Sequence, residues 1–379
     1  MNPTVRPIPA DEHRAFLAGL SSASFLQTPA WGAVKSEWRA ESLGWYDGER
    51  MAGAGLVLYR RLPRLKRSLA YLPEGPVLDW DVDDLGSWLE PMTRHLRSQG
   101  AFGVRMGPPV VTRRWSADQV KQGIADARVT RLGEIAPLER SAVGARVVQQ
   151  LEGLGWRPQV AAGGFAAGQP QYTFVLPLVE TGARRTEDDV LAGMNQLWRR
   201  NIRKADKAGV RVTRGGPHQL EAFHELYVHT AQRDHFTARP FSYFQTMFDA
   251  MGAEDPGRIT LWLAHHEGDL VAATIAVRVG THAWYSYGAS SSDKREVRGS
   301  NAVQWAMIRD AIDQGADVYD LRGITDTLDP DDPHVGLIQF KVGTGGEAVE
   351  SVGEWDLPLN RMLYRGFQLY LTRRAGRRG

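Results

Sequence analysis

The chain contains no cysteine among its 379 residues, which excludes disulfide bonds, thiolate nucleophiles and cysteine-bound metal sites. No apolar run approaches the ~20 residues that a helix needs to span a bilayer. The first residues, MNPTVRPIPADEHRAFL, lack the basic and apolar segments of a signal peptide. These absences predict a soluble cytoplasmic protein.

A large charge of one sign is also missing. Lys and Arg number 46, and Asp and Glu number 44, so the formal net charge is only +2. The chain as a whole is therefore no polycation for nucleic acid, and we expect no stable DNA binding. Anion binding must come from local clusters. One such cluster, the tail LTRRAGRRG, is either a frayed end or a segment weakly attracted to an acidic surface.

Motifs of several enzyme classes are absent. The sequence has no GxSxG, HExxH or Walker A stretch. The Asp-rich loop DTLDPDDPH is more typical of a solvated turn than of a cation site. The segment REVRGSNAVQW has only one of the glycines that an acyl-CoA loop uses, so we interpret Ser300 or Asn301 as a helix cap. We expect neither a bound metal nor a cofactor.

The stretch from Thr186 to Val210 has the pattern of one amphipathic helix, with Thr186 as its cap and Gly209 as its end. An apolar stripe recurs at spacings of three and four residues: Leu191, Met194, Trp198, Ile202 and Ala205. The opposite face is basic and carries Arg199, Arg200, Arg203, Lys204 and Lys207. Such a row either faces water or binds an anion.

The two halves of the chain repeat one plan. The segment MTRHLRSQGA, which begins at Met92, aligns without gaps with MIRDAIDQGA, which begins at Met307. Turn signals at Gly48 and Gly268 each separate two β-rich runs. We therefore expect two mixed α/β sheets packed with helices, a first domain over residues 1–170 and a second over residues 171–347. Residues 348–379 are expected to pack back on the first domain, and AAGGFAAGQP is the expected connector.

This plan resembles the GCN5-related N-acetyltransferase fold, present twice in tandem. The segment GWYDGERMAGAGLVLYRRLPRLKRSLAYLPEGPVLDW is especially similar to actinobacterial-type members of the FemABX family of peptidoglycan aminoacyltransferases. Six segments, in order from Phe25 to about Glu347, are similar to that family as a whole. They are FLQTPAWGAVKSEW, LAYLPEGPVLDW, LWRRNIRKADKAGV, ELYVHTAQRDHF, AWYSYGASSS and GLIQFKVGTGGE. No long coiled-coil arm is expected, because residues 209–223 leave no room for one.

The resemblance implies an activity and partners. Members of the family take an amino acid from an aminoacyl-tRNA and add it to the side-chain amine of a peptidoglycan precursor stem peptide. The likeness to actinobacterial-type members implies glycine, and hence glycyl-tRNA. The acceptor would be a muramyl-pentapeptide precursor, either nucleotide-linked or lipid-linked. A lipid-linked acceptor would bring the protein into peripheral contact with the inner face of the membrane.

The resemblance also implies roles for single residues. Lys35 and Arg200 correspond to the residues that hold the precursor phosphates, and Trp38 lies beside Lys35 as a further candidate for precursor binding. Neighbouring cations on the basic helix are alternatives for Arg200, namely Arg199, Arg203 and Lys204. The strands that carry Tyr71, and Tyr285 with Tyr287, would line the peptide cleft. The Phe-Lys pair that supports transfer corresponds to Phe340 and Lys341.

The expected chemistry agrees with these residue types. Aminolysis of an activated ester needs positioning of both substrates and stabilisation of an oxyanion, which the Lys341 cation could supply. No obvious general base is present, and Asp79 is a weak candidate. Two alternatives remain: an acyl-CoA-dependent acyltransferase of the same fold, and a non-catalytic protein that binds a cell-wall precursor. Without the resemblance, each tyrosine could equally be a half-buried sheet residue.

Overall fold

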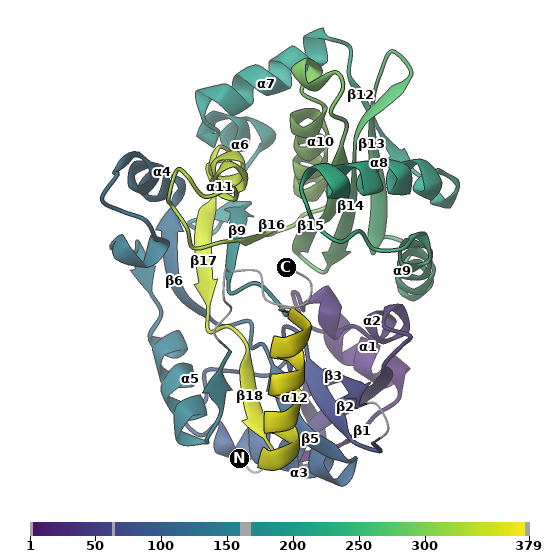
Figure 1. The fold of residues 1–379 in the computed structure, drawn as a ribbon, viewed down its shortest axis with the longest axis vertical. Helices are drawn as coiled ribbons and strands as arrows, with labels where there is room; N and C mark the ends of the chain where they lie inside the picture. Colours follow the sequence, from purple (N-terminus) through teal and green to yellow (C-terminus); the bar gives the residue numbers. More distant parts are fainter. Residues whose placement is uncertain (1–2, 63–64, 160–167, 376–379) are drawn as a thin grey trace. The chain divides into compact units, whose positions relative to one another are not determined.

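The computed structural model describes residues 3–62, 65–159 and 168–375 (Figure 1). The chain divides into two compact units. The first unit holds residues 1–112, 140–171 and 350–379, and the second holds residues 113–139 and 172–349. Most of the connector AAGGFAAGQP and the last four residues of the basic tail lie outside the described residues. Among the described residues, no helix combines the length and the apolar content that a membrane span requires.

The first unit is built on a seven-stranded sheet of order β1-β2-β3-β4-β5-β18-β8. Its strands are β1 (Thr4–Pro7), β2 (Arg39–Asp47), β3 (Arg50–Arg61), β4 (Ser68–Leu72), β5 (Ala101–Met106), β18 (Trp355–Pro358) and β8 (Arg157–Pro158). Neighbouring strands are antiparallel except β4 and β5, which pair in parallel along the whole of β4. Gly48, with φ 62°, makes the expected turn between β2 and β3.

The second unit is built on a nine-stranded sheet of order β12-β13-β14-β15-β16-β9-β17-β6-β7. Its strands are β12 (Arg211–Gly215), β13 (Ile259–His266), β14 (Asp269–Val279), β15 (His282–Ser290), β16 (Val318–Ile324), β9 (Tyr172–Pro177), β17 (Glu347–Ser351), β6 (Val111–Ser116) and β7 (Glu139–Arg140). The short strands β10 (Val179–Glu180) and β11 (Ala183–Arg184) form a separate hairpin. β15 and β16 are parallel, but they pair only from His282 with Val318 to Trp284 with Asp320.

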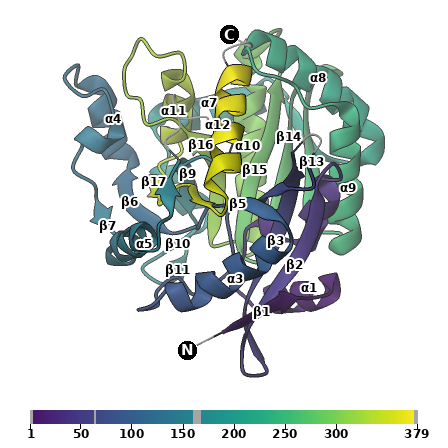
Figure 2. The same ribbon diagram turned by 60° about the horizontal axis from the view of Figure 1, so that its bottom comes forward.

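Helices cover both sheets. The first unit contains α1 (Ala10–Ala18), α2 (Pro29–Val34), α3 (Gly86–Ser98), α5 (Ala142–Gly153), α12 (Arg361–Ala375) and the 3₁₀ turn Phe25–Gln27. The second contains α4 (Ala117–Ala125), α6 (Glu187–Gly193), α7 (Gln196–Lys207), α8 (Leu220–Arg233), α9 (Phe241–Glu254), α10 (Gly299–Asp313), α11 (Val335–Val342) and the 3₁₀ turns Leu132–Glu134, Pro217–Gln219 and Arg295–Val297. Figure 2 shows α8 and α9 on one side of β13 and β14, with α10 on the other. The mixed α/β class that we expected is confirmed.

The internal repeat is visible in the strand order of both sheets. In each, four antiparallel strands are followed by a crossover helix, a parallel fifth strand and an antiparallel sixth strand. Met92 of α3 and Met307 of α10, the first residues of the matching segments, are both buried in their cores. The sixth strands differ in their place along the chain, because β18 comes after the other five strands of its repeat whereas β9 comes before the other five of its own.

The expected extent of the first domain was wrong for residues 113–139. These residues belong to the second unit, because β6 adds to the nine-stranded sheet beside β17. Trp115, Val120 and Leu132 are buried in the core of the second unit. The stretch Gly107-Pro108-Pro109 precedes this change of unit, but it does not indicate which sheet the next strand joins, so only the long-range strand pairing reveals it.

The single helix expected over residues 186–210 is two helices, α6 and α7. Met194 is extended at the break, and the Asn195 side chain caps α7 by accepting a hydrogen bond from the Trp198 amide. The Asn195 amide donates to the carbonyl of Gly343 at 3.0 Å. A Cβ at Gly345 would collide with the Gly193 carbonyl. The chain therefore leaves the helical path in order to pack closely against the turn over residues 343–345.

We predict that Gly345→Ala will destabilise the protein by at least about 3 kcal/mol, because it combines left-handed backbone strain at φ 79° with the collision at Gly193. The matched control is Gly268→Ala. Gly268 also has positive φ, but an added Cβ meets nothing within 4 Å, so about 1 kcal/mol is expected. Urea unfolding measures both losses, and equal losses would show that the close approach at Gly193 is unimportant.

Candidate functional site

Lys341, near the end of α11, is almost completely buried, with 3% of its surface exposed. Its ammonium donates to the backbone carbonyls of Arg322, at 3.2 Å, and Gly323, at 2.6 Å. These carbonyls lie near the end of β16, where Arg322 has φ 63°. Burial lowers the pKa of Lys341 from 10.5 to about 7, although the charge of Asp320 opposes the shift. Lys341 can therefore gain or lose a proton near neutral pH.

Phe340 connects this lysine to the basic helix α7. Its carbonyl accepts a hydrogen bond from the Trp198 indole at 2.8 Å, and the two rings lie 4.8 Å apart. Gly343 permits this packing, since a Cβ there would collide with the Trp198 ring. The apolar stripe of α7 thus holds the backbone directly before Lys341.

A cavity of about 250 Å³ in the second unit is lined by Phe340, although not by Lys341 itself. Phe340 forms part of its wall, and Tyr285, Gly288 and Ser290 contribute from the part of β15 that has left β16. Other walls come from the end of α8 and the start of α10, including Thr230, Arg233, Asp234, Ser300 and Gln304. The separation of two parallel strands therefore leaves room for a ligand inside this unit.

Tyr285 and Tyr287, which we expected to line one cleft, point to opposite faces of the sheet. A β-bulge causes this, because Tyr285 pairs with Ala276 while Tyr287 pairs with the adjacent Ile275, which leaves Ser286 as the extra residue. Tyr285 lines the cavity, where burial and then the charge of Asp234 raise its pKa to about 12.

Tyr287 instead belongs to an aromatic cluster with α8 and α9. Its hydroxyl lies 2.9 Å from that of Tyr243, and its ring contacts Phe244 and Tyr227. Alternation alone would place both tyrosines on one face. A cavity role is therefore open to Tyr285 but not to Tyr287.

Of the four cations of α7 that are candidates for phosphate binding, one is structural and three are unpaired. Arg199 is half-buried and donates to the carbonyl of Ala192 at 2.9 Å, across the break between the helices. Arg200, Arg203 and Lys204 are exposed, and their side chains make no hydrogen bond or ion pair with any described residue. These three side chains remain available to an anion.

In the first unit, Trp38 and Tyr71 come together. Their rings lie 6.2 Å apart, and the guanidinium of Arg60 lies 5.7 Å from the Trp38 ring. The helix that we expected to reach Trp38 ends at Val34, so Lys35 is its C-cap and Trp38 lies just before β2. The ammonium of Lys35 is 5.0 Å from the Trp31 ring.

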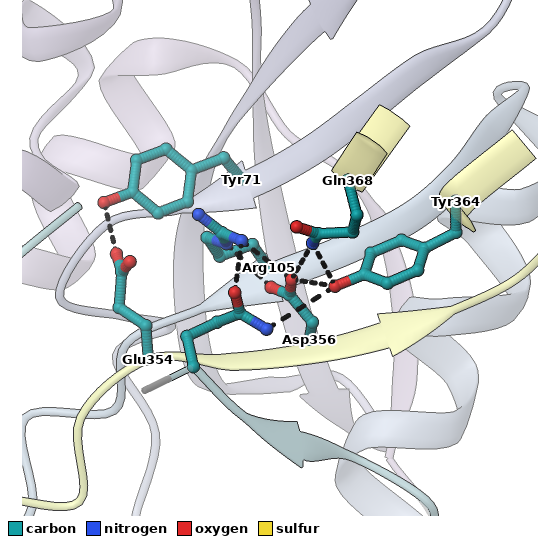
Figure 3. A network of polar contacts seen from close by, with 7 residues as sticks. Tyr71, Arg105, Glu354, Asp356, Tyr364 and Gln368 are labelled. Atoms are coloured by element: carbon teal, nitrogen blue, oxygen red, sulfur yellow. Dashed lines mark hydrogen bonds and ion pairs between the residues drawn. The ribbon is translucent and has the colours of Figure 1, made fainter. Parts of the chain in front are cut away.

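Sequence reasoning missed Glu354, which lies beside Tyr71 (Figure 3). The Tyr71 hydroxyl donates to the Glu354 carboxylate at 2.6 Å, and the Gln169 amide donates to Tyr71 at 3.4 Å. Burial raises the pKa of Glu354, while the Tyr71 hydroxyl and the Arg105 charge oppose the shift. Burial and the charge of Glu354 raise the pKa of Tyr71 well above its usual value. The only sequence signal is that two acids, Glu354 and Asp356, flank Trp355.

A buried ion pair supports this arrangement from the next strands (Figure 3). Arg105 donates to both carboxylate oxygens of Asp356 at 2.7 Å and to Gln159 at 2.9 Å. Tyr364 and Gln368 of α12 also donate to Asp356. In the backbone register of the sheet, Arg105 of β5 lies opposite Tyr71 of β4 on one side and opposite Asp356 of β18 on the other. These three side chains therefore lie in one row across adjacent strands.

We predict that Lys341 makes stability depend on pH. In the unfolded state the lysine keeps its proton up to about pH 10.5, and in the folded state only up to about pH 7. The unfolded state therefore binds more protons between these two pH values. Stability should therefore rise with pH in this window, by about 2 kcal/mol from pH 7 to pH 9. Lys341→Met should lack this rise in urea unfolding. Parallel pH dependences for the two proteins would contradict the lowered pKa.

Comparisons with known proteins agree with this architecture. The sequence model of the FemAB family matches residues 8–265 and 264–371 of this chain. The chain is 24% identical to Lipid II:glycine glycyltransferase of Staphylococcus aureus (strain USA300), and the alignment covers 93% of this chain and 92% of that protein. It is also 22% identical in sequence to the solved structure of FemX, with a TM-score of 0.78 over 95% of this chain and 98% of that one.

A tandem GNAT protein from the clavulanic acid biosynthesis pathway has the same general fold. Its TM-score is 0.52 at 12% identity, and the match covers 94% of this chain and 98% of that one. At these identities the structural likeness shows the fold alone. The fold is therefore a tandem acetyltransferase-like one.

Proposed function

Because the chain belongs to the FemAB family, we propose that it is a transferase of peptidoglycan biosynthesis that moves glycine from glycyl-tRNA to a precursor stem peptide. The acceptor is the side-chain amine of the third residue, and the precursor is lipid-linked. The relative in Staphylococcus aureus, named for glycine transfer to lipid II, supports the class of acceptor and the amino acid. A lipid-linked acceptor brings the protein to the membrane surface.

The observation that carries this proposal is the buried Lys341 directly after Phe340, which lines a cavity of about 250 Å³. In the reaction, the acceptor amine attacks the ester carbonyl, a C–N bond forms, the C–O bond to ribose breaks, and the amine proton ends on the ribose oxygen. A lysine with a pKa of about 7 can stabilise the oxyanion as a cation and then supply a proton to the leaving oxygen. The amine restores that proton afterwards, so no nucleophilic cysteine or serine is needed.

The dimensions of the cavity favour a small aminoacyl donor over acyl-CoA. Its volume is below the range of ~300–1,000 Å³ that is typical of sites for larger ligands. The single glycine at the start of α10, Gly299, is explained by packing, since a Cβ there would collide with Val271. It is therefore no evidence for a pyrophosphate-binding loop, which argues against the acyl-CoA alternative.

The three unpaired cations of α7 suit the diphosphate of the acceptor. Arg200, Arg203 and Lys204 can form charge-assisted hydrogen bonds with it. In the first unit, we assign Lys35, Trp38 and Tyr71 to the same precursor, because a half-buried aromatic pair and a lysine suit a peptide attached to phosphate.

The test is transfer of labelled glycine from glycyl-tRNA to lipid-linked and nucleotide-linked precursors. We expect Lys341→Met to lower kcat by at least about 100-fold while acceptor binding changes less than about twofold, because Lys341 acts on the transition state. Lys121→Met, which removes an exposed lysine of α4, is the control and should be fully active.

Two outcomes would contradict the proposal. Transfer from acetyl-CoA instead of glycyl-tRNA would favour the acyltransferase alternative. Precursor binding without any transfer, whether or not Lys341 is present, would favour a non-catalytic binding protein.

We also expect Arg200→Ala with Arg203→Ala to weaken precursor binding by roughly 10- to 100-fold, the value of one or two charge-assisted hydrogen bonds. Calorimetry measures this, with Arg211→Ala on β12 as the control, since Arg211 is also exposed. The unfolding free energy should change by less than about 0.5 kcal/mol, because both side chains are exposed and unpaired. Unchanged affinity in the double variant would mean that the basic face of α7 lies in water and does not bind the precursor.

A further inference from the structure

The C-terminal helix α12 packs on the first sheet by one side only (Figure 1). Tyr364 and Phe367 are buried against Leu69 and Phe102, and Leu363 packs on the same group. Tyr364 and Gln368 also hold Asp356 of β18. This side is therefore occupied, and it fixes the helix on the sheet.

The other side of α12 exposes large apolar side chains. Met362 is 78% exposed and Leu369 is 53% exposed. They are seven residues apart, so they lie on one line along the helix. Arg361 and Arg365 lie on one flank of that line and Arg373 on the other, and all three are exposed. An apolar centre flanked by arginines is typical of a helix that lies in the plane of a membrane interface.

The charge around this helix has one sign. After Asp356 the chain has no acidic residue, and it has six arginines: Arg361, Arg365, Arg373, Arg374, Arg377 and Arg378. The turn after β3 lies beside α12, since Leu62 packs on the same cluster as Leu363 and the Arg60 guanidinium is 6.0 Å from the Phe367 ring. Exposed Arg61, Lys66 and Arg67 come from this turn, in a stretch without acids from residue 50 to residue 73.

We propose that the exposed face of α12, defined by Arg361, Met362, Arg365, Leu369 and Arg373, binds the surface of an anionic bilayer. Arginine side chains pair with acidic lipid headgroups, and the apolar side chains enter the boundary with the acyl chains. An RNA partner would pair its phosphates with the arginines. Proteins hold RNA bases by stacking them on aromatic side chains, however, so RNA would leave the exposed Met and Leu side chains without a partner. The face therefore suits lipid better than RNA. It would serve the proposed function by keeping the enzyme where a lipid-linked acceptor resides.

Vesicle co-sedimentation of the full chain, without substrates, tests this proposal. We expect binding to vesicles made of equal parts of phosphatidylglycerol and phosphatidylcholine, little binding to pure phosphatidylcholine, and release at high salt. Arg361→Glu with Arg365→Glu should weaken binding at least about tenfold. Folding should be retained, because both residues are exposed and because Arg361 lies in the first turn of α12, where a carboxylate is favourable.

Matched controls separate this face from general charge and general apolarity. Arg94→Glu with Arg97→Glu changes charge equally, on exposed positions of α3 in the same unit, and should leave vesicle binding within about twofold. Met362→Gln with Leu369→Gln should also weaken binding, without a change of charge. Its control is Leu20→Gln with Leu138→Gln, at two exposed leucines elsewhere.

Three outcomes would overturn the proposal: no binding of the unaltered protein to anionic vesicles, an equal loss in the α3 control, or a loss of tRNA binding in place of vesicle binding in the Arg361→Glu, Arg365→Glu variant. The transfer assay remains independent. That variant should transfer glycine normally to a nucleotide-linked precursor but poorly to a lipid-linked precursor in vesicles. If neither the unaltered protein nor the variants transfer glycine while vesicle binding follows the expected pattern, the proposed function is wrong, but the proposal that α12 binds the membrane is supported.

Discussion

The ion pair between Arg105 and Asp356 is the interaction on which the first unit depends. Asp356 is fully buried, and its carboxylate receives both arms of the guanidinium together with donors from α12. A buried carboxylate that lost this partner would carry a large desolvation cost, so strand β18 and helix α12 are held to β5 together. Two residues before Asp356, Glu354 reaches the Tyr71 hydroxyl by the same pairing of strands. The polar side chains of this unit and helix α12 therefore share one support.

The two copies of the fold differ in how far their parallel strands remain paired. In the first unit β4 and β5 pair throughout, and in the second β15 and β16 separate after three residue pairs. The separation leaves the cavity beside Phe340, and a β-bulge at Ser286 turns Tyr285 into it while Tyr287 turns away. Duplication thus supplied two similar sheets, and local irregularities in one of them made room for a ligand.

Lys341 illustrates the energetic cost of such a site. A lysine that is buried against backbone carbonyls has a lowered pKa, because no full counter-charge replaces its water. The protonated form then destabilises the fold at neutral pH, which is typical of groups whose position serves chemistry. Trp198 and Gly343 offset part of this cost by packing the neighbouring backbone closely.

The sequence by itself determined features that depend on residues close together in the chain. Examples are the turn at Gly48, the apolar stripe through Trp198, the mixed α/β class and the repeat around Met92 and Met307. Local patterning is enough for these, since each pattern decides which side of one element faces a core. The sequence also predicted the basic face of α7, but it could not separate Arg199, which bonds Ala192, from its unpaired neighbours.

Only the tertiary structure decided which distant segments pair. Arg105 and Asp356 are 251 positions apart in the sequence and form an ion pair, and residues 113–139 join the second unit. The helix is interrupted at Asn195 because the chain packs there against the turn at residues 343–345. The bulge that separates Tyr285 from Tyr287 likewise depends on the partner strand β14. These features depend on long-range strand register and close packing. Neither leaves a signal in the residues that surround it in the chain, so the sequence could name candidates for a site but could not assemble them.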